Sequence, residues 1–255
     1  MPDSRIVIVT AGGPHVWVIV NAVQDRLGPV TVVMEEPESK ARLLRNRARK
    51  LGWFNVAGQL GTMVFTRLRK LFLSRRDATA LAGESVKPEP VADQAIVTVG
   101  SANSRELVDT LEKLRPQVVL LAGCRMLSQS TLDGIPCPVL NYHAGINPKY
   151  RGMNGAYWAL ATGDADNFGA TVHAVDAGVD TGDVIYQVRG RPEAGDNLTN
   201  YALRLAVMSR DICVRAVEDA LEGRLRPVRT DMPSQQWYHP TLWSYIWTGV
   251  TKGVW

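Results

Sequence analysis

Polar side chains that could act in catalysis are concentrated in two short stretches of the chain. The first reads LNYHAGINPKYRGMNGAYWAL over residues 140–160, and the second reads GATVHAVDAGVDTGDVI over residues 169–185. An extended strand places alternate side chains on one face, so Asn141 and His143 should lie together. A histidine can carry a proton near neutral pH, and an asparagine amide can donate hydrogen bonds to an oxygen that becomes negative. This pair therefore suits the stabilisation of a charged carbonyl oxygen.

The second stretch supplies carboxylates for the same chemistry. Asp176 and Asp180 lie in a loop punctuated by glycines, and a carboxylate bonded to an imidazole orients the ring and favours its charged form. Alone, an Asn-x-His at a strand end is also typical of a structural loop anchor, and Asp with Gly is typical of turns. We interpret His173, in the strand-like TVHAV, as a partly buried histidine hydrogen-bonded near the site rather than as a catalytic base.

The elements that would position these residues alternate along the chain. Apolar runs typical of strands alternate with segments of helical spacing, which predicts a mostly parallel, Rossmann-like α/β sheet with helices on both faces. Ligands of such sheets bind beyond the carboxyl ends of the strands, where Asn141 falls. The expected strands are residues 5–10, 30–34, 95–99, 117–122, 139–142, 184–188 and 226–231. The expected helices are residues 15–27, 104–114 (capped by Asn103 or Ser104) and 198–221.

The composition fits one globular catalytic unit with appendages. Of 255 residues, 45% are hydrophobic and 21% are charged, which predicts a catalytic domain over residues 1–232 and an aromatic tail over residues 233–255. Cys124, Cys137 and Cys213 have neither metal-ligand spacing nor an even count, so we expect reduced thiols. The chain starts without a signal peptide, and no apolar run is long enough to cross a bilayer, so the expected location is the cytoplasm.

Taken together, the two stretches resemble a known family. NYHAGINPKYRGMNGAYWALATGD followed by GATVHAVDAGVDTGDVI is similar to the catalytic region of the 10-formyltetrahydrofolate-dependent formyltransferases. That family includes glycinamide ribonucleotide formyltransferase, methionyl-tRNA formyltransferase and the amino-sugar N-formyltransferases. The specific features are Asn-x-His, then Pro-Lys-Tyr-Arg-Gly, then Asp-x-Gly-x-Asp-Thr-Gly, within a resemblance that is good over residues 95–190. It implies the formyltransferase fold.

The resemblance assigns roles to residues at the matching positions. Asn141, His143 and Asp180 match the catalytic trio, since Asp180 directly precedes Thr181-Gly182. Two loops are implied to bind the folate co-substrate, the first lining the pteridine pocket chiefly through backbone groups. The implied folate contacts are Gly123, Cys124, Arg125, Met126, Leu127, Val175, Asp176, Gly178 and Val179. The implied acceptor contacts are Gly12, Gly13, His15, Arg151 and Gly152.

The resemblance also implies a mechanism of acyl transfer. A neutral primary amine attacks the formyl carbon of 10-formyltetrahydrofolate, and Asn141 with a charged His143 stabilises the alkoxide of the tetrahedral intermediate. Asp180 holds the imidazolium and, through a water, helps to move the proton from the attacking nitrogen to the leaving N10. We expect neither a metal nor a covalent enzyme intermediate.

Three alternatives remain for what the chain acts on. The loop AGGPHVW lacks the nucleotide-binding spacings and the Ser-Asn pair with which glycinamide ribonucleotide enzymes hold a phosphate, so Gly12 and Gly13 suit a turn. We therefore favour a nucleotide-linked 4-amino-4,6-dideoxysugar of surface-polysaccharide (lipopolysaccharide) biosynthesis over glycinamide ribonucleotide of purine biosynthesis. The intact trio argues against a non-catalytic folate-binding protein. Methionyl-tRNA enzymes carry a further C-terminal barrel, for which we expect the 64 residues after Arg191 to be too few, so no nucleic-acid partner is expected.

A basic segment interrupts the expected fold at about residues 38–78. Eleven Lys or Arg residues and no acidic residue occur over residues 40–76, among apolar positions that predict two helices around Gly52 or Gly58. One interpretation is a solvated helix pair packed on the sheet edge. The other is a surface for an anionic partner, either a nucleotide diphosphate or anionic membrane lipids. The apolar positions are Leu43, Leu44, Leu51, Phe54, Leu60, Val64, Leu68 and Leu71.

The tail WYHPTLWSYIWTGVTKGVW contains four of the seven tryptophans of the chain. Such aromatic side chains cover a core or the partner subunit of a homodimer, and they also suit a membrane interface or a site where a nucleotide base stacks. The sequence leaves these alternatives open.

Overall fold

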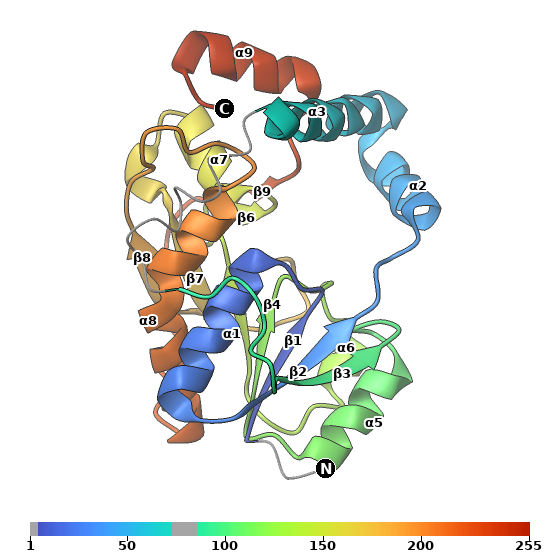
Figure 1. Cartoon of the computed structure of the whole chain (residues 1–255), viewed down its shortest axis with the longest axis vertical. Coiled ribbons are helices and arrows are strands. Elements are labelled where there is room, and N and C mark those ends of the chain that lie inside the picture. The colour runs from blue at the N-terminus through green and yellow to red at the C-terminus, as the bar shows by residue number, and fades with distance from the viewer. Residues whose placement is uncertain (1–4, 73–85) are drawn as a thin grey trace.

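A computed structural model describes residues 5–72 and 86–255, and its centre is a seven-stranded sheet (Figure 1). The strand order is β3-β2-β1-β4-β5-β7-β8, in which β1 to β5 run parallel and β7 is antiparallel to both neighbours. The prediction of a mostly parallel α/β sheet is confirmed. The end of the expected insertion, residues 73–78, lies outside the described residues. The strands are β1 (Ile6–Thr10), β2 (Val30–Glu35), β3 (Ala95–Val99), β4 (Val118–Ala122), β5 (Val139–His143), β7 (Gly169–Ala174) and β8 (Val184–Arg189).

Helices cover both faces of the sheet, as the continuous apolar strands require. In β1, Ile6 belongs to one hydrophobic core and its neighbour Val7 to another, because successive side chains of a strand point to opposite faces. α1 (Pro14–Leu27) and α8 (Tyr201–Leu221) lie side by side over the first face. α5 (Arg105–Leu114) covers the second face (Figure 1).

Local signals explain where several elements begin and end. The hydroxyl of Ser104 accepts a hydrogen bond from a backbone N–H in the first turn of α5, so Ser104 rather than Asn103 is the cap. The strand predicted over residues 226–231 is wrong. Only Val228 forms a bridge, with Val184, because Pro227 has no N–H to donate to a strand ladder.

The basic segment forms two helices at one end of the molecule (Figure 1). α2 (Lys40–Leu51) and α3 (Trp53–Phe72) meet at Gly52, whose φ of 79° lies in the left-handed region that favours glycine. Gly52 is therefore the break between the predicted helices, and Gly58 lies inside α3. The C-terminal segment forms α9 (Leu242–Lys252), which packs against α3.

α3 packs against α9 and its neighbour α2 rather than against the edge of the sheet. The hydroxyl of Thr62, on the buried side of α3, donates to the backbone carbonyl of Pro240 over 2.9 Å. The interpretation of α3 as a helix packed on the sheet edge is therefore wrong, because its packing partners are α2 and α9 and most of its large apolar side chains are exposed. Those exposed side chains include Phe54, Leu60, Val64 and Leu68, at 39–74% exposure.

A second sheet of two short strands attaches the tail to the catalytic region. β6 (Arg151–Gly152) pairs in parallel with β9 (Gln236–Trp237). The ring of Trp237 stacks on that of Trp158 with a centroid distance of 4.6 Å, and its indole N–H donates to the carbonyl of Lys149 over 3.1 Å. The first part of the aromatic tail thus packs against the Pro-Lys-Tyr-Arg-Gly segment.

Candidate active site

The carboxyl end of β5 holds Asn141 and His143, and the loop between β7 and β8 brings Asp180 to them. Nδ2 of Asn141 donates to Oδ1 of Asp180 over 3.1 Å, and Nδ1 of His143 lies 3.4 Å from Oδ2. The φ of Asp180 is 49°, in the left-handed region that aspartate enters more readily than most residues. The three residues predicted as a catalytic trio are therefore in direct contact.

Both ring nitrogens of His143 face hydrogen-bond acceptors. Nε2 lies 2.7 Å from the backbone carbonyl oxygen of Tyr150, which can only accept, and Nδ1 faces the carboxylate of Asp180. A ring that donates from both nitrogens carries a positive charge, so this arrangement fits the imidazolium. The side chain of His143 is only 8% exposed, which limits competition from water.

The surroundings of Asp180 hold it in the ionised form. Burial alone would raise the pKa of this carboxyl. Attraction to His143 and the backbone N–H of Gly152, which donates to Oδ2 over 2.8 Å, act against burial, and the pKa lies well below its ordinary value. The trio thus combines an ionised carboxylate with an imidazole whose two ring nitrogens both face hydrogen-bond acceptors.

This ionised carboxylate predicts a specific sensitivity to acid. The pKa of Asp180 is lower in the folded chain than in the unfolded chain, so the ionised side chain contributes to the free energy of unfolding. That contribution is complete above the ordinary pKa of 3.8, and it is lost as the pH falls through the lower pKa of the folded chain. The parent protein should therefore lose stability below pH 3.8 more steeply than Asp180→Asn. Urea unfolding at a series of pH values measures both slopes, with Asp183→Asn as an exposed control in the same loop. Parallel slopes for the parent and Asp180→Asn would contradict the buried ion pair.

His173 fixes the orientation of the Asn141 amide. Nδ1 of His173 lies 2.7 Å from the carbonyl oxygen of Ala174, so Nδ1 carries the proton and Nε2 accepts from Nδ2 of Asn141 over 3.0 Å. Both N–H bonds of that amide are then engaged, one by His173 and one by Asp180. To accept a hydrogen bond from Asn141, an oxyanion in the site would have to replace His173 or Asp180 as the partner of one of these N–H groups. The interpretation of His173 as a hydrogen-bonded histidine near the site agrees with this geometry and with its 2% exposure.

The trio lines a cleft of about 460 Å³, a volume typical of small-molecule sites. All nine residues predicted to contact folate line the same cleft. They come from the loop that follows β4 and from the loop that precedes Asp180. The fold therefore gathers these two loops and the end of β5 around one cavity.

The predicted acceptor residues divide between this cleft and its surroundings. His15 and Gly152 line the cleft, whereas the two glycines after β1 are not among its lining residues. Burial lowers the pKa of His15, so its ring is neutral near pH 7 and adds no positive charge for a phosphate. Arg151 also lies outside the lining. Its Nη1 donates to the carbonyl of Val179 over 2.8 Å and so holds the loop that precedes Asp180.

Two residues that the sequence did not assign to the site hold the loop over residues 123–127. Glu35, at the end of β2 and only 3% exposed, accepts a hydrogen bond from the backbone N–H of Arg125 over 2.6 Å. The side chain of Asn103 donates to the carbonyl of Met126 over 2.9 Å. An acidic residue directly after a buried apolar strand was the available signal for Glu35, because a buried carboxylate requires partners.

The cysteines are free thiols in the structure. Burial raises the pKa of Cys124, which lines the cleft, to about 12. This thiol is therefore neutral and a weak nucleophile. Over residues 5–72 and 86–255, the structure shows no group of three or more His, Cys, Asp or Glu side chains that could hold a metal ion.

Two segments outside the predicted site also line the cleft. α2 contributes Leu43, Asn46, Arg47 and Lys50, and the C-terminal segment contributes Gln236, Trp237 and Tyr238. The sequence did not assign these residues to the site, because neither segment carries one of its motifs, although a nucleotide diphosphate on the basic segment and a stacked base on the tail were among the alternatives left open. Their arrangement gives the cleft one cationic side and one aromatic side.

Comparison with known proteins identifies the class to which this fold and site belong. The family model described as Formyl transferase matches residues 61–217, which is more than half of the chain. The chain therefore belongs to the formyl transferase family, a family of enzymes, as its motifs predicted.

Individual relatives show how far the likeness extends. The methionyl-tRNA formyltransferase of Finegoldia magna is 30% identical over 125 residues, which cover 49% of this chain and 40% of that protein. Glycinamide ribonucleotide transformylase 1 from Symbiobacterium toebii has a TM-score of 0.57 and 21% identity, and the match covers 89% of this chain and 94% of that one. The N-formyltransferase from Helicobacter canadensis, solved with folinic acid and dTDP-3-aminofucose, has a TM-score of 0.57 and 11% identity. The match covers 92% of this chain and 70% of that one. This chain thus spans less than half of the curated relative, and the structural likenesses show the fold alone.

Proposed function

We propose that this chain transfers a formyl group from 10-formyltetrahydrofolate to the primary amine of a nucleotide-linked amino sugar. The observation that carries formyl transfer is the direct contact of Asn141, His143 and Asp180 inside one cleft. The reaction would take place in the cytoplasm, where the three cysteines stay reduced.

The catalytic trio would stabilise charge and move a proton. Negative charge develops on the formyl oxygen as the amine adds to the formyl carbon, and the His143 imidazolium with an N–H of Asn141 would stabilise that charge. Asp180 keeps the imidazole charged and oriented. Through a water, its carboxylate would also help to move the proton from the attacking nitrogen to N10 of the co-substrate as the bond between the formyl carbon and N10 breaks.

The cleft suits a folate in shape and in chemistry. When bound, 10-formyltetrahydrofolate would supply the formyl group, and apolar Leu121, Leu127 and Val175 line the space for its ring. The loop over residues 123–127 would offer backbone hydrogen bonds to the ring. Since Glu35 already fixes that loop, little ordering would be needed on binding.

The acceptor is proposed from the charges and rings around the cleft. Arg47 and Lys50 of α2 supply cations, while His15 beside the β1 loop is neutral, so the acceptor phosphates should lie on the α2 side. Trp237 and Tyr238 offer rings on which a nucleotide base can stack. The Helicobacter canadensis enzyme was solved with dTDP-3-aminofucose, which supports an acceptor of this class on the same fold.

Two other acceptors remain candidates, each with a specific observation. Methionyl-tRNA is supported by the name of the Finegoldia magna relative and by the basic α2. Glycinamide ribonucleotide is supported by the Symbiobacterium toebii structure, of which the match covers 94%. A folate-binding protein without catalysis would not need the charged trio.

An acceptor screen that follows tetrahydrofolate release would decide between them. We expect nucleoside-diphosphate 4-amino-sugars to give a kcat/KM at least roughly tenfold above that of glycinamide ribonucleotide, a difference of roughly 1.4 kcal/mol in transition-state binding. The variant Arg47→Gln with Lys50→Gln should raise the acceptor KM and leave the folate KM unchanged. Turnover of glycinamide ribonucleotide or methionyl-tRNA, with no turnover of any amino-sugar nucleotide, would overturn the proposed amino-sugar acceptor. No turnover on any amine would overturn formyl transfer itself.

A further inference from the structure

The buried side of helix α3 is mainly polar and its exposed side is mainly apolar, with Val56 as a buried apolar residue at 2% exposure. Gln59, Thr62 and Thr66 are 0–8% exposed, and they face the protein. On the opposite side, Val64 is 59% exposed and Leu68 is 51% exposed. A surface helix of a globular protein ordinarily shows the reverse pattern. Thus α3 presents an apolar stripe that no other part of the described chain covers.

Helix α9 repeats this arrangement beside α3. Trp243, Ile246, Trp247 and Val250 follow the spacing of one helical face and are 39–73% exposed. The buried residues of the helix are Tyr245, Thr248 and Gly249. Every large side chain that α9 exposes on this stripe is therefore apolar, and two of the four are tryptophans.

The two stripes join into one preformed surface, which we call the α3–α9 face. Phe54 of α3 stacks on Trp243 of α9 with a ring centroid distance of 4.4 Å, and both rings are at least 45% exposed. Further along α3, Nη1 of Arg69 donates to the hydroxyl of Tyr245 of α9 over 3.3 Å. Contiguous exposed apolar surface of this kind marks an interaction site.

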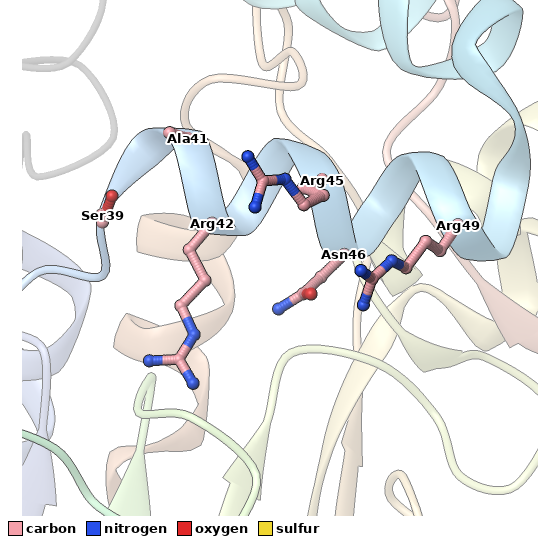
Figure 2. Close-up of a pocket in the computed structure, with 6 residues that line it drawn as sticks. All are labelled: Ser39, Ala41, Arg42, Arg45, Asn46 and Arg49. Atoms are coloured by element: carbon pink, nitrogen blue, oxygen red, sulfur yellow. The ribbon is translucent and has the colours of Figure 1, made fainter.

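The charges around the α3–α9 face identify its partner. Neither α2, α3 nor α9 contains an acidic residue. Figure 2 shows Arg42, Arg45 and Arg49 projecting from α2 beside a hollow of about 510 Å³ whose six lining residues include no carboxylate. Arg67 is also exposed on α3. The apolar face is thus accompanied by cations only, which an anionic surface would complement.

We propose that the α3–α9 face docks on the surface of an anionic phospholipid bilayer. The apolar side chains would enter the boundary between headgroups and acyl chains, and the tryptophans would lie at the level of the headgroups. The arginines of α2 and α3 would pair with lipid phosphates. None of the helices that the structure describes could span a membrane. The helices would therefore lie in the plane of the interface.

The charge pattern also argues against a second copy of the chain as the occupant. A two-fold interface would bring two sets of α2 and α3 cations toward each other with no acidic residue on these helices to offset them. A bilayer instead supplies the missing negative charge. Because α2 also lines the active-site cleft, docking would place that cleft near the membrane surface.

Sedimentation with lipid vesicles tests this proposal without any need for turnover. The parent protein should bind vesicles of phosphatidylcholine with phosphatidylglycerol, and bind far less to phosphatidylcholine alone. Replacing Arg45, Arg49 and Arg67 with Gln should lower the partition coefficient on the order of 100-fold at low salt, and added salt should have the same effect. The matched control replaces Arg105, Lys113 and Arg115, three exposed cations on or next to α5, with Gln and should bind normally.

A second variant separates the apolar contribution from charge. Trp247→Gln with Val250→Gln changes side chains that are 70% and 73% exposed, so the fold should persist. We expect at least roughly tenfold weaker vesicle binding and unchanged formylation of a soluble acceptor without vesicles. Absence of parent binding to anionic vesicles would overturn the proposal, as would equal binding by the parent and both variants. A parent dimer that this variant dissociates, with no vesicle binding, would instead assign the face to a second copy.

Discussion

His143→Ala should lower kcat/KM for formyl transfer by roughly 100- to 1000-fold, because one preorganised donor to a developing oxyanion contributes about that much. Folate binding should survive, since the ring of His143 is buried between Tyr150 and Asp180 and contributes little surface to the cleft. Single-turnover kinetics with 10-formyltetrahydrofolate, together with a folate-binding titration, measures both quantities.

Asp180→Asn should cause a loss of similar size, because in the proposed mechanism its carboxylate orients the imidazole and stabilises the positive charge on it. The double variant should be close to the worse single variant, since both residues act on one imidazolium. Asp183→Asn, which removes the same charge from an exposed position in the same loop, should retain activity. Near-normal turnover in His143→Ala or Asp180→Asn, or additive losses in the double variant, would contradict this assignment.

Gly145→Ala should have the second large effect although Gly145 carries no chemistry. A Cβ at this position would lie 2.6 Å from Nε2 of His143 and 2.6 Å from the carbonyl oxygen of Tyr150. The ring or the carbonyl must then move, and a displacement of about 1 Å in a catalytic group can cost on the order of 100-fold in rate. We therefore expect kcat to fall roughly 100-fold while the folate KM changes little.

Gly100→Ala provides the matched control for this variant. A Cβ at Gly100 would meet only Glu106 Oε2, at 3.9 Å, and the position lies outside the cleft. Circular dichroism and thermal melting should show both variants folded. An active Gly145→Ala would mean that the contact between His143 and the Tyr150 carbonyl is not needed for turnover.

Much of the fold and the identity of the trio could be read from the sequence. The continuous apolar strands predicted a buried, mostly parallel sheet, because local side-chain alternation and helix-breaking residues act over a few neighbours. By resemblance, the motifs around Asn141 and Asp180 predicted three residues that the structure brings into contact. Failures at this level were local as well, as at residues 226–231, where the missing N–H of Pro227 outweighed the strand-like composition.

Only the tertiary structure decided which distant groups share the site and which side of each helix faces water. Glu35 bonds to the backbone of Arg125, and α2 and Trp237 line the same cleft. These segments are far apart in the sequence, and their spacing along the chain does not say which of them meet in the folded protein. The apolar spacing of α3 is equally compatible with burial and with exposure. Its orientation was set by Thr62 bonding to Pro240 and by Phe54 stacking on Trp243, and these partners lie about 180 residues further along the chain. Periodicity gives a helix its two faces, but the packing partner determines which face remains outside.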